Sequence, residues 1–201
     1  APRWRVVAPA GGWVRLGNGM AVPAARLPRR TRADASVWVV PGLGERSPAA
    51  LQARLAQDDA RQAAHALDAQ LRGGGQVGAG CASVFLLQTC GALSGRRVTT
   101  SWWLAPHLQK LEPGCTVVAD RMVCVDGPIA TAGAAFAQAD LMLHLLQSRL
   151  GAPLAEQVRR MMVLGEREAQ APYAIPALLA GGDALVARIT ALIESSLPKP
   201  P

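Results

Sequence analysis

The sequence predicts an α/β fold in which a doubly wound, mostly parallel sheet carries helices on both faces. Short apolar runs alternate with longer helical stretches, and the loops between them are short. The apolar run at 35–40, closed by Pro41 and Gly42, has the composition of a strand that is buried on both faces. Aromatic residues are only 4% of the chain, whereas alanine, leucine, valine and glycine are abundant, which suits close packing of helices on a sheet.

Short strands are expected before residue 41. Residues 4–8 read as an apolar strand and residues 14–16 as an alternating segment, and the Gly-Asn-Gly turn at 17–19 predicts a β-hairpin. The run at 35–40 should be a central parallel strand. Because open α/β sheets place ligands at the carboxyl ends of such strands, Gly42 becomes a candidate ligand contact.

A helical region and an abrupt turn follow. Residues 47–71 repeat apolar positions at intervals of three and four, which predicts one helix, or two with a break near Asp58 and Asp59. A strand that includes Val77 then leads to Cys81, and a helix is expected from there to Gly91. Small residues on both sides of Cys81 are typical of a nucleophile elbow, whose following backbone amides lie at a helix N-terminus. A buried structural cysteine at a tight turn fits the same residues.

The alternation of strands and helices continues toward the carboxyl end. The expected strands are 97–100, 116–118, 122–125 and 128–131, and the expected helices are 105–111, 134–150 and 153–163. Residues 183–197 would form a further amphipathic helix after a glycine break. We therefore expect one domain over 1–180 and a helix that leaves it over 181–201, the alternative being that this helix packs back as the last core helix.

Charge and cysteine content limit the partners. The formal net charge is +7, and seven arginines fall within the first 32 residues, whereas the rest of the chain is nearly balanced. No aromatic or glycine interleaving accompanies these arginines, so a solvated edge is favoured over a nucleic-acid groove. No apolar run is long enough to span a membrane. The four cysteines form no CxxC pair and lack a nearby histidine, so we expect a reduced cytoplasmic protein without disulfides, structural metal or cofactor.

The stretch that begins at Cys81 resembles the ThiJ/PfpI class of the class I glutamine-amidotransferase-like superfamily, specifically the amino-terminal domains of GlxA-type AraC-family transcription regulators. Those domains carry a cysteine, an apolar helix and then Gly-Leu-Leu-Asp-Gly-x-x-x-Thr-Thr-His-Trp. Here residues 91–102 read Gly-Ala-Leu-Ser-Gly-Arg-Arg-Val-Thr-Thr-Ser-Trp. Further matches are Ile-Ala-Thr-Ala-Gly-Ala at 129–134, Asp-Leu-Met-Leu-His at 140–144 and Gln-Ala-Pro-Tyr at 170–173. The resemblance implies a flavodoxin-like fold and a sensor domain.

The same resemblance implies a place within a longer protein. Members of the family begin with a strand and a helix that, in the enzymatic branches, contribute an acidic side chain near the cysteine, and these have no counterpart here. Two helix-turn-helix units follow the sensor domain in the family. We therefore expect residues 1–180 to be a sensor domain without its first strand and helix, and residues 181–201 to be a linker helix toward a helix-turn-helix DNA-binding domain.

Departures from the family pattern weaken the case for catalysis. Ser101 stands where the family has a histidine, and a hydroxyl cannot act as an imidazole base near neutral pH. Ser83 replaces the family's glycine two residues after the cysteine. His144 reads as a core residue, and His65 and His107 read as exposed. A cysteine hydrolase needs a thiolate, a base and oxyanion donors, and the base is missing by residue type.

We therefore expect a binding module, in which a small polar metabolite, such as one derived from an amino acid or an amine, binds beside the cysteine. The expected ligand contacts are Gly42, Cys81, Ala82, Ser83, Ser101 and Thr131. The alternatives are a cysteine-dependent hydratase or hydrolase that uses Cys81, and a domain that serves chiefly for dimerisation. We expect a homodimer because two-fold association is common, and contact with DNA only through the absent DNA-binding domain.

Overall fold

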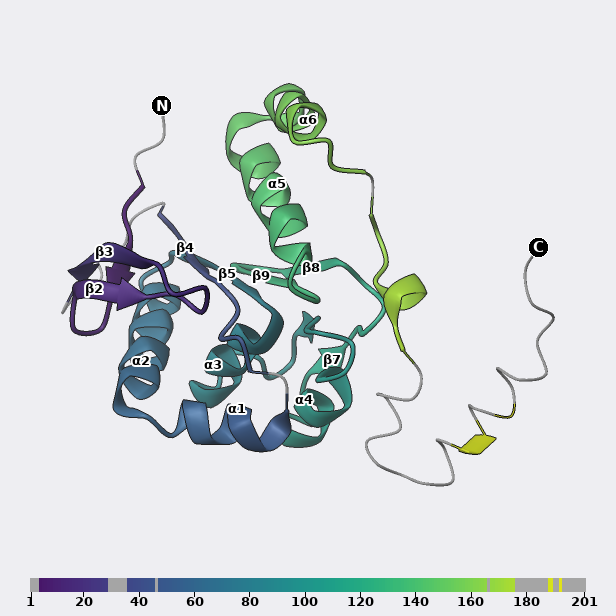
Figure 1. The fold of residues 1–201 in the computed structure, drawn as a ribbon, viewed down its shortest axis with the longest axis horizontal. Coiled ribbons are helices and arrows are strands. Elements are labelled where there is room, and N and C mark those ends of the chain that lie inside the picture. The colour runs from purple at the N-terminus through teal and green to yellow at the C-terminus, as the bar shows by residue number, and fades with distance from the viewer. Residues whose placement is uncertain are drawn as a thin grey trace.

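The computed structural model describes residues 4–28, 36–45, 47–165, 167–175, 188–189 and 192. Its centre is a four-stranded sheet in which three parallel strands are followed by an antiparallel edge strand (Figure 1). In order across the sheet, the strands are β4 (Val37–Val40), β5 (Gln76–Gly80), β9 (Ile129–Ala132) and β8 (Val123–Asp126).

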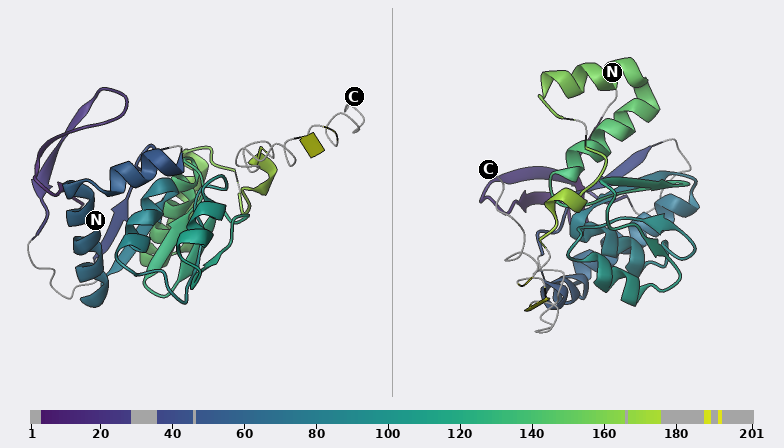
Figure 2. Two further views of the ribbon diagram at one scale, coloured as in Figure 1. Left: turned by 90° about the horizontal axis from the view of Figure 1, so that it is seen from below. Right: turned by 90° about the vertical axis from the view of Figure 1, so that its right-hand side faces the viewer.

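Helices cover both faces of this sheet, as Figures 1 and 2 show. The helices on one face are α1 (Pro48–Leu55), α2 (Asp58–Arg72), α3 (Val84–Thr89) and α4 (Ala105–Leu111). The other face carries α5 (Ala137–Leu150), against which α6 (Ala152–Met161) packs. The predicted fold class, an α/β sheet with helices on both sides, is confirmed.

The alternation of side chains along the strands gives each face its own core. Val77 and Ala79 of β5 are buried against the face of α1–α4, whereas Ala130 and Ala132 of β9 are buried with Leu141 of α5. Glycine at position 78 lets α5 come close to the sheet. A Cβ atom there would lie 3.3 Å from Leu145 Cδ1 and 3.4 Å from Leu141 Cδ2.

A second sheet precedes the main one. It has the order β1-β3-β2, with β1 (Val7–Ala8), β2 (Gly12–Arg15) and β3 (Ala21–Arg26). The hairpin predicted at 17–19 is confirmed, since Leu16 N donates to Met20 O over 2.7 Å between β2 and β3. The hairpin turn implies a strand after it, but the bounds of β3 were not predicted, because Ala-Val-Pro-Ala-Ala-Arg contains a proline and a single β-branched residue.

The remaining elements follow the predictions with shifted boundaries. The helical region breaks between α1 and α2 near Asp58, as expected, and α5 begins at Ala137 rather than at 134. The strands β6 (Arg97–Val98) and β7 (Thr116–Val117) pair with each other as a separate parallel ladder. Short 3-10 helices are η1 (Cys81–Ser83) and η2 (Ala171–Tyr173).

The structure describes little of the carboxyl end of the chain. Most of the helix expected over 183–197 lies outside the described residues, so the division into 1–180 and 181–201 remains a prediction. Within the described part of the chain, no helix is both long enough and apolar enough to cross a membrane. All four cysteines are free thiols.

Candidate functional site

Cys81 lies at the turn where β5 ends and the helical segment η1–α3 begins, as the sequence predicts for a nucleophile elbow. Its φ of 56° lies in the left-handed region, which a residue with a side chain rarely adopts. Two hydrogen bonds hold this conformation. Cys81 N donates to Gly133 O (3.0 Å), and Thr100 Oγ1 donates to Cys81 O (2.8 Å). Such strain persists only where neighbouring structure enforces it, and it is frequent at functional sites.

The thiol of Cys81 faces a hydroxyl. Ser101 Oγ donates a hydrogen bond to Cys81 Sγ over 2.9 Å, and Ser101 is fully buried while Cys81 is half-buried. The Ser101 carbonyl accepts hydrogen bonds from Leu104 N (2.8 Å) and Ala105 N (3.0 Å), which fixes the loop at the start of α4. The structure thus brings Ser101 beside the cysteine.

Gly42 borders the thiol from the carboxyl end of β4. A Cβ atom on Gly42 would lie 3.3 Å from Cys81 Cβ and 3.8 Å from Cys81 Sγ, so a larger residue would crowd the sulfur. Gly42 is exposed, which leaves this side of the half-buried thiol next to solvent. Ala82 follows Cys81 as the second residue of η1, and its methyl group is fully buried.

The hydroxyls of Ser83 and Thr131 are engaged within the fold. Ser83 Oγ lies 3.0 Å from Val40 O and 2.8 Å from Gly80 O, and it accepts a hydrogen bond from Gly80 N (3.1 Å). Thr131 Oγ1 accepts from Thr99 N over 2.9 Å. Both residues are fully buried, so their hydroxyls tie the strands of the elbow together, and a direct ligand contact by either of them remains a prediction.

Gln170 is a residue of this region that sequence analysis did not select. It is 1% exposed, and its Nε2 lies within hydrogen-bond distance of Thr100 O (2.8 Å), Thr99 Oγ1 (3.2 Å) and Arg121 O (3.2 Å). Its Oε1 accepts from Ala134 N (3.2 Å). The only sequence signal was the Gln-Ala-Pro-Tyr match at 170–173, which gives no location for the amide.

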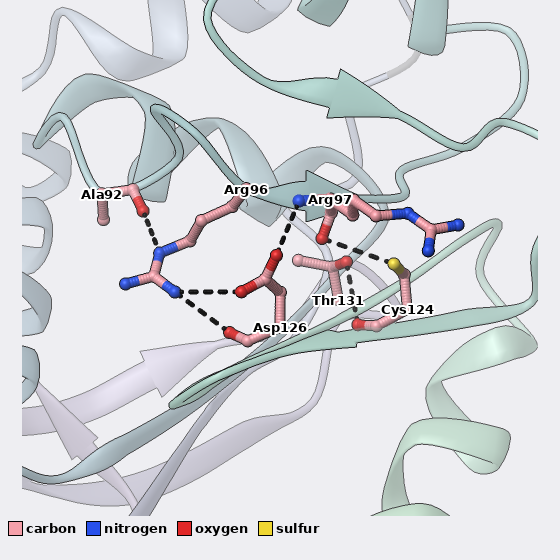
Figure 3. A network of polar contacts seen from close by, with 6 residues as sticks. All are labelled: Ala92, Arg96, Arg97, Cys124, Asp126 and Thr131. Atoms are coloured by element: carbon pink, nitrogen blue, oxygen red, sulfur yellow. Dashed lines mark hydrogen bonds and ion pairs between the residues drawn. The ribbon is translucent and has the colours of Figure 1, made fainter.

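A carboxylate fixes the strand that leads to Ser101 (Figure 3). Asp126 Oδ2 accepts from Arg97 N (2.9 Å), and Asp126 Oδ1 pairs with Arg96 Nη1 (3.2 Å). Arg96 Nε also donates to Ala92 O (3.1 Å), and Cys124 Sγ donates to Arg97 O (3.4 Å). The network therefore ties β6 to β8 just before the chain reaches the Thr-Thr-Ser loop at 99–101.

No histidine serves this site in the described residues, where Cys81 Sγ has no hydrogen bond to an imidazole. His65 is exposed, as predicted, and His144 is half-buried on α5. His107 is half-buried rather than exposed, because its ring stacks on Phe85 with centroids 5.8 Å apart. Burial lowers the pKa of His107 below its ordinary value, and nearby Lys110 lowers it further.

The structure has a pocket of about 280 Å³ away from Cys81. It lies where the second sheet meets α2, and its lining residues are Pro9, Arg26, Leu27, Pro28, Gln62, His65, Ala66 and Ala69. None of the predicted ligand contacts belongs to this pocket. Across the described residues, no group of three His, Cys, Asp or Glu side chains is placed to hold a metal ion.

The fold has a largely parallel sheet covered by helices, and a cysteine with a strained backbone lies where a central strand turns into a helix. These two features define the class of α/β proteins with which this chain is compared. Residues 4–148 match the family model described as the DJ-1/PfpI family. The chain belongs to this family, and the resemblance drawn from the sequence is confirmed.

Individual relatives agree with this assignment. The chain is 30% identical over 166 residues to the HTH-type transcriptional regulator CdhR of Pseudomonas aeruginosa. This match covers 81% of this chain and 45% of CdhR. It is also 31% identical over 159 residues to the HTH-type transcriptional regulator GlxA of Rhizobium meliloti. This second match covers 78% of this chain and 46% of GlxA. The chain thus spans less than half the length of these curated relatives.

A solved structure supports the fold. The crystal structure of an AraC family transcriptional regulator from Pseudomonas putida matches with a TM-score of 0.65 and 19% identity over 80% of each chain. At this level of identity, the match shows a shared fold.

Proposed function

We propose that this chain is the effector-sensing and dimerisation region of a transcription regulator of the GlxA type, acting in the cytoplasm. One observation carries the proposal: two HTH-type regulators share about 30% identity with four fifths of this chain, while the match spans less than half of each regulator. DNA recognition would then reside in polypeptide outside this chain. The natural coding sequence beyond Pro201 tests this point, because a continuation without two helix-turn-helix patterns contradicts it.

The effector site would be the edge of the sheet beside Cys81. Gly42 leaves space on one side of the thiol, and Ser101 Oγ provides a hydroxyl at 2.9 Å from Cys81 Sγ. The Ser101 hydroxyl donates to the sulfur, and the thiol can in turn donate to an oxygen atom, so a small polar metabolite with a carbonyl or carboxylate oxygen suits the site. We propose that the metabolite lies against Gly42 and Cys81, while the fully buried Ala82, Ser83, Ser101 and Thr131 shape the site from within the fold.

Thermal unfolding in the presence of amino acids and their amine and keto-acid derivatives tests the effector site. A ligand that binds only the folded state stabilises it by about 2.7 kcal/mol at a hundredfold excess over its dissociation constant. The effect should vanish after Cys81 is carbamidomethylated by iodoacetamide. It should persist in Ala66→Trp, a variant that fills the pocket beside α2. The opposite pattern would place the effector in that pocket and contradict the proposal.

A cysteine-dependent hydratase or hydrolase is the second candidate, and the strained φ of Cys81 favours it. The contact between Cys81 Sγ and Ser101 Oγ argues for binding instead, since a neutral hydroxyl is a poor general base. Assays with isocyanides, small aldehydes and peptides separate the two candidates. Multiple turnovers that disappear in Cys81→Ala support the enzyme, whereas equal background rates in both proteins support the sensor.

Dimerisation is the third part of the proposal. Large apolar side chains are exposed where α6 ends, with Met161 83% and Val163 90% exposed. Such side chains are typical of contact surfaces, and a two-fold homodimer is the commonest closed assembly. Sedimentation equilibrium should give the mass of a dimer for the wild-type protein. The double variant Met161→Lys/Val163→Lys should shift the mass toward the monomer, and an unchanged dimer would place the contact elsewhere.

A further inference from the structure

We propose that Gln170 is a positioning residue for the Cys81 site and that it couples this site to the chain segment 167–175. The inference deepens the proposed function, on which it rests only for the biological meaning of the coupling. The geometry that carries it is independent of any effector.

The Gln170 amide fills a buried polar space between three loops. Its Nε2 reaches oxygens at residues 99, 100 and 121, and its Oε1 accepts from Ala134 N. Both ends of the amide are therefore engaged, in a side chain that is 1% exposed. An apolar side chain at this position would leave a buried backbone carbonyl and a backbone amide without partners.

Gly133 shows how closely the amide packs against the elbow. A Cβ atom on Gly133 would lie 2.4 Å from Gln170 Oε1, 2.6 Å from Gln170 Cδ and 2.8 Å from Gln170 Nε2. Position 133 must therefore lack a side chain if the amide is to remain where it is. The carbonyl of this same glycine accepts the hydrogen bond from Cys81 N over 3.0 Å.

Gln170 thus touches both groups that hold the strained backbone of Cys81. One is Gly133, which it contacts directly. The other is Thr100, whose carbonyl accepts from Gln170 Nε2 (2.8 Å) and whose Oγ1 donates to Cys81 O (2.8 Å). The next residue, Ser101, carries the hydroxyl that contacts the thiol. A displacement of Gln170 would release the elbow and its loop together.

The backbone around Gln170 pairs with residues 120–122. Gln170 N donates to Asp120 O (2.6 Å) and Met122 N donates to Glu168 O (2.9 Å), around an antiparallel bridge between Arg121 and Ala169. Figure 1 shows that the segment runs from α6 past the edge of the main sheet toward η2. It therefore leaves the site in the direction of the carboxyl-terminal part of the chain.

The test compares buried glutamines in the complete protein. Gln170→Ala removes the amide at the site, and Gln70→Ala is the matched control, because Gln70 is 2% exposed and bonds to Ser36 O (3.2 Å) away from the elbow. Alkylation of Cys81 by iodoacetamide is followed by peptide mass spectrometry over a pH series. We expect Gln170→Ala to accelerate alkylation of Cys81 about fivefold, because the loss of one typical hydrogen bond raises the population of the released elbow by about that factor. Gln70→Ala should leave the rate unchanged despite a similar loss of thermal stability.

Two further measurements keep the test decisive if Gln170→Ala folds poorly. Gly133→Ala pushes the amide away from the elbow and should accelerate alkylation in the same way, and Gln170→Glu should give an intermediate rate because it keeps the acceptor oxygen. Conversely, carbamidomethylation of Cys81 should speed hydrogen exchange at Gln170 N and Tyr173 N, since coupling is reciprocal. Unchanged Cys81 rates in both Gln170→Ala and Gly133→Ala would make Gln170 merely structural and overturn the proposal. Failure of the proposed function would show instead as the absence of any stabilising metabolite.

Discussion

The backbone conformation of Cys81 limits which side chains fit at this position, independently of the thiol. Because φ is 56°, a β-branched side chain at this buried turn would strain the backbone. We expect Cys81→Val to lower the free energy of unfolding by about 1–3 kcal/mol, and Cys81→Gly to keep it near the wild-type value.

Urea denaturation checks this expectation, with Cys90→Val as the control, since Cys90 is half-buried too but has an ordinary φ of −93°. Equal destabilisation by the two valine variants would mean that volume, and not backbone strain, determines the result at Cys81.

Thr131 illustrates how a predicted ligand contact can serve the fold. Its Oγ1 accepts from Thr99 N (2.9 Å), and both residues are fully buried. Thr131→Val has nearly the same shape but leaves that amide unpaired, which should cost about 1–3 kcal/mol of unfolding free energy. The exposed Thr116→Val on β7 should cost much less. A Thr131→Val variant as stable as the wild type, yet unable to bind the effector, would instead make this hydroxyl a ligand contact.

His107 should make stability depend on pH. Burial lowers its pKa in the folded state below the ordinary 6.5, so the unfolded chain binds the proton first as the pH falls. The stability contribution is therefore complete above pH 6.5 and is lost progressively below it. We expect His107→Gln to show a smaller loss of thermal stability than the wild type between neutral and mildly acidic pH. The exposed His65→Gln is the control, and parallel curves for His107→Gln and wild type would contradict the assignment.

At the scale of elements, the sequence predicted what depends on local pattern. The run at 35–40 and the small residues around Cys81 gave the central strand and the elbow, because strand burial and tight turns impose composition directly. The sequence did not predict the bounds of β3 or its pairing with β1, because β3 carries little strand propensity and gains its partners only through the hairpin and this parallel ladder. The role of Gln170 was invisible for a similar reason, since its partners at 99, 100, 121 and 134 are far away in the chain.

The short strand β6 is held in place by the Asp126 carboxylate. β6 has only two residues, and the Asp126 carboxylate accepts from Arg97 N and pairs with Arg96 (Figure 3). Because Asp126 is partly exposed, we expect Asp126→Ala to cost about 1–2 kcal/mol and to speed hydrogen exchange at Arg97 and Val98. The exposed Asp58→Ala, whose pair with Arg61 lies on the surface of α2, should change neither quantity appreciably. Unaltered exchange in β6 after loss of Asp126 would show that the ladder with β7 holds it alone.

At the scale of the whole molecule, charge and similarity to regulators suggest different behaviour toward DNA. The net charge of +7 attracts any polyanion, whereas sequence recognition needs an element that reaches base edges. The matched regulators are HTH-type proteins, and this chain spans less than half of each. If DNA recognition resides outside this chain, as proposed, any DNA binding by the chain itself should be electrostatic only.

We expect weak gel retardation at low salt, equal for a promoter fragment and for a scrambled duplex, that disappears by about 0.2 M salt. The triple variant Arg5→Gln/Arg15→Gln/Arg26→Gln removes three exposed positive charges and lowers the formal net charge from +7 to +4. It should weaken retardation of both duplexes equally, because contacts to phosphates carry no sequence information. A complex that prefers the promoter and survives physiological salt would mean that this chain reads DNA itself, and it would contradict the assignment of DNA recognition to polypeptide outside it.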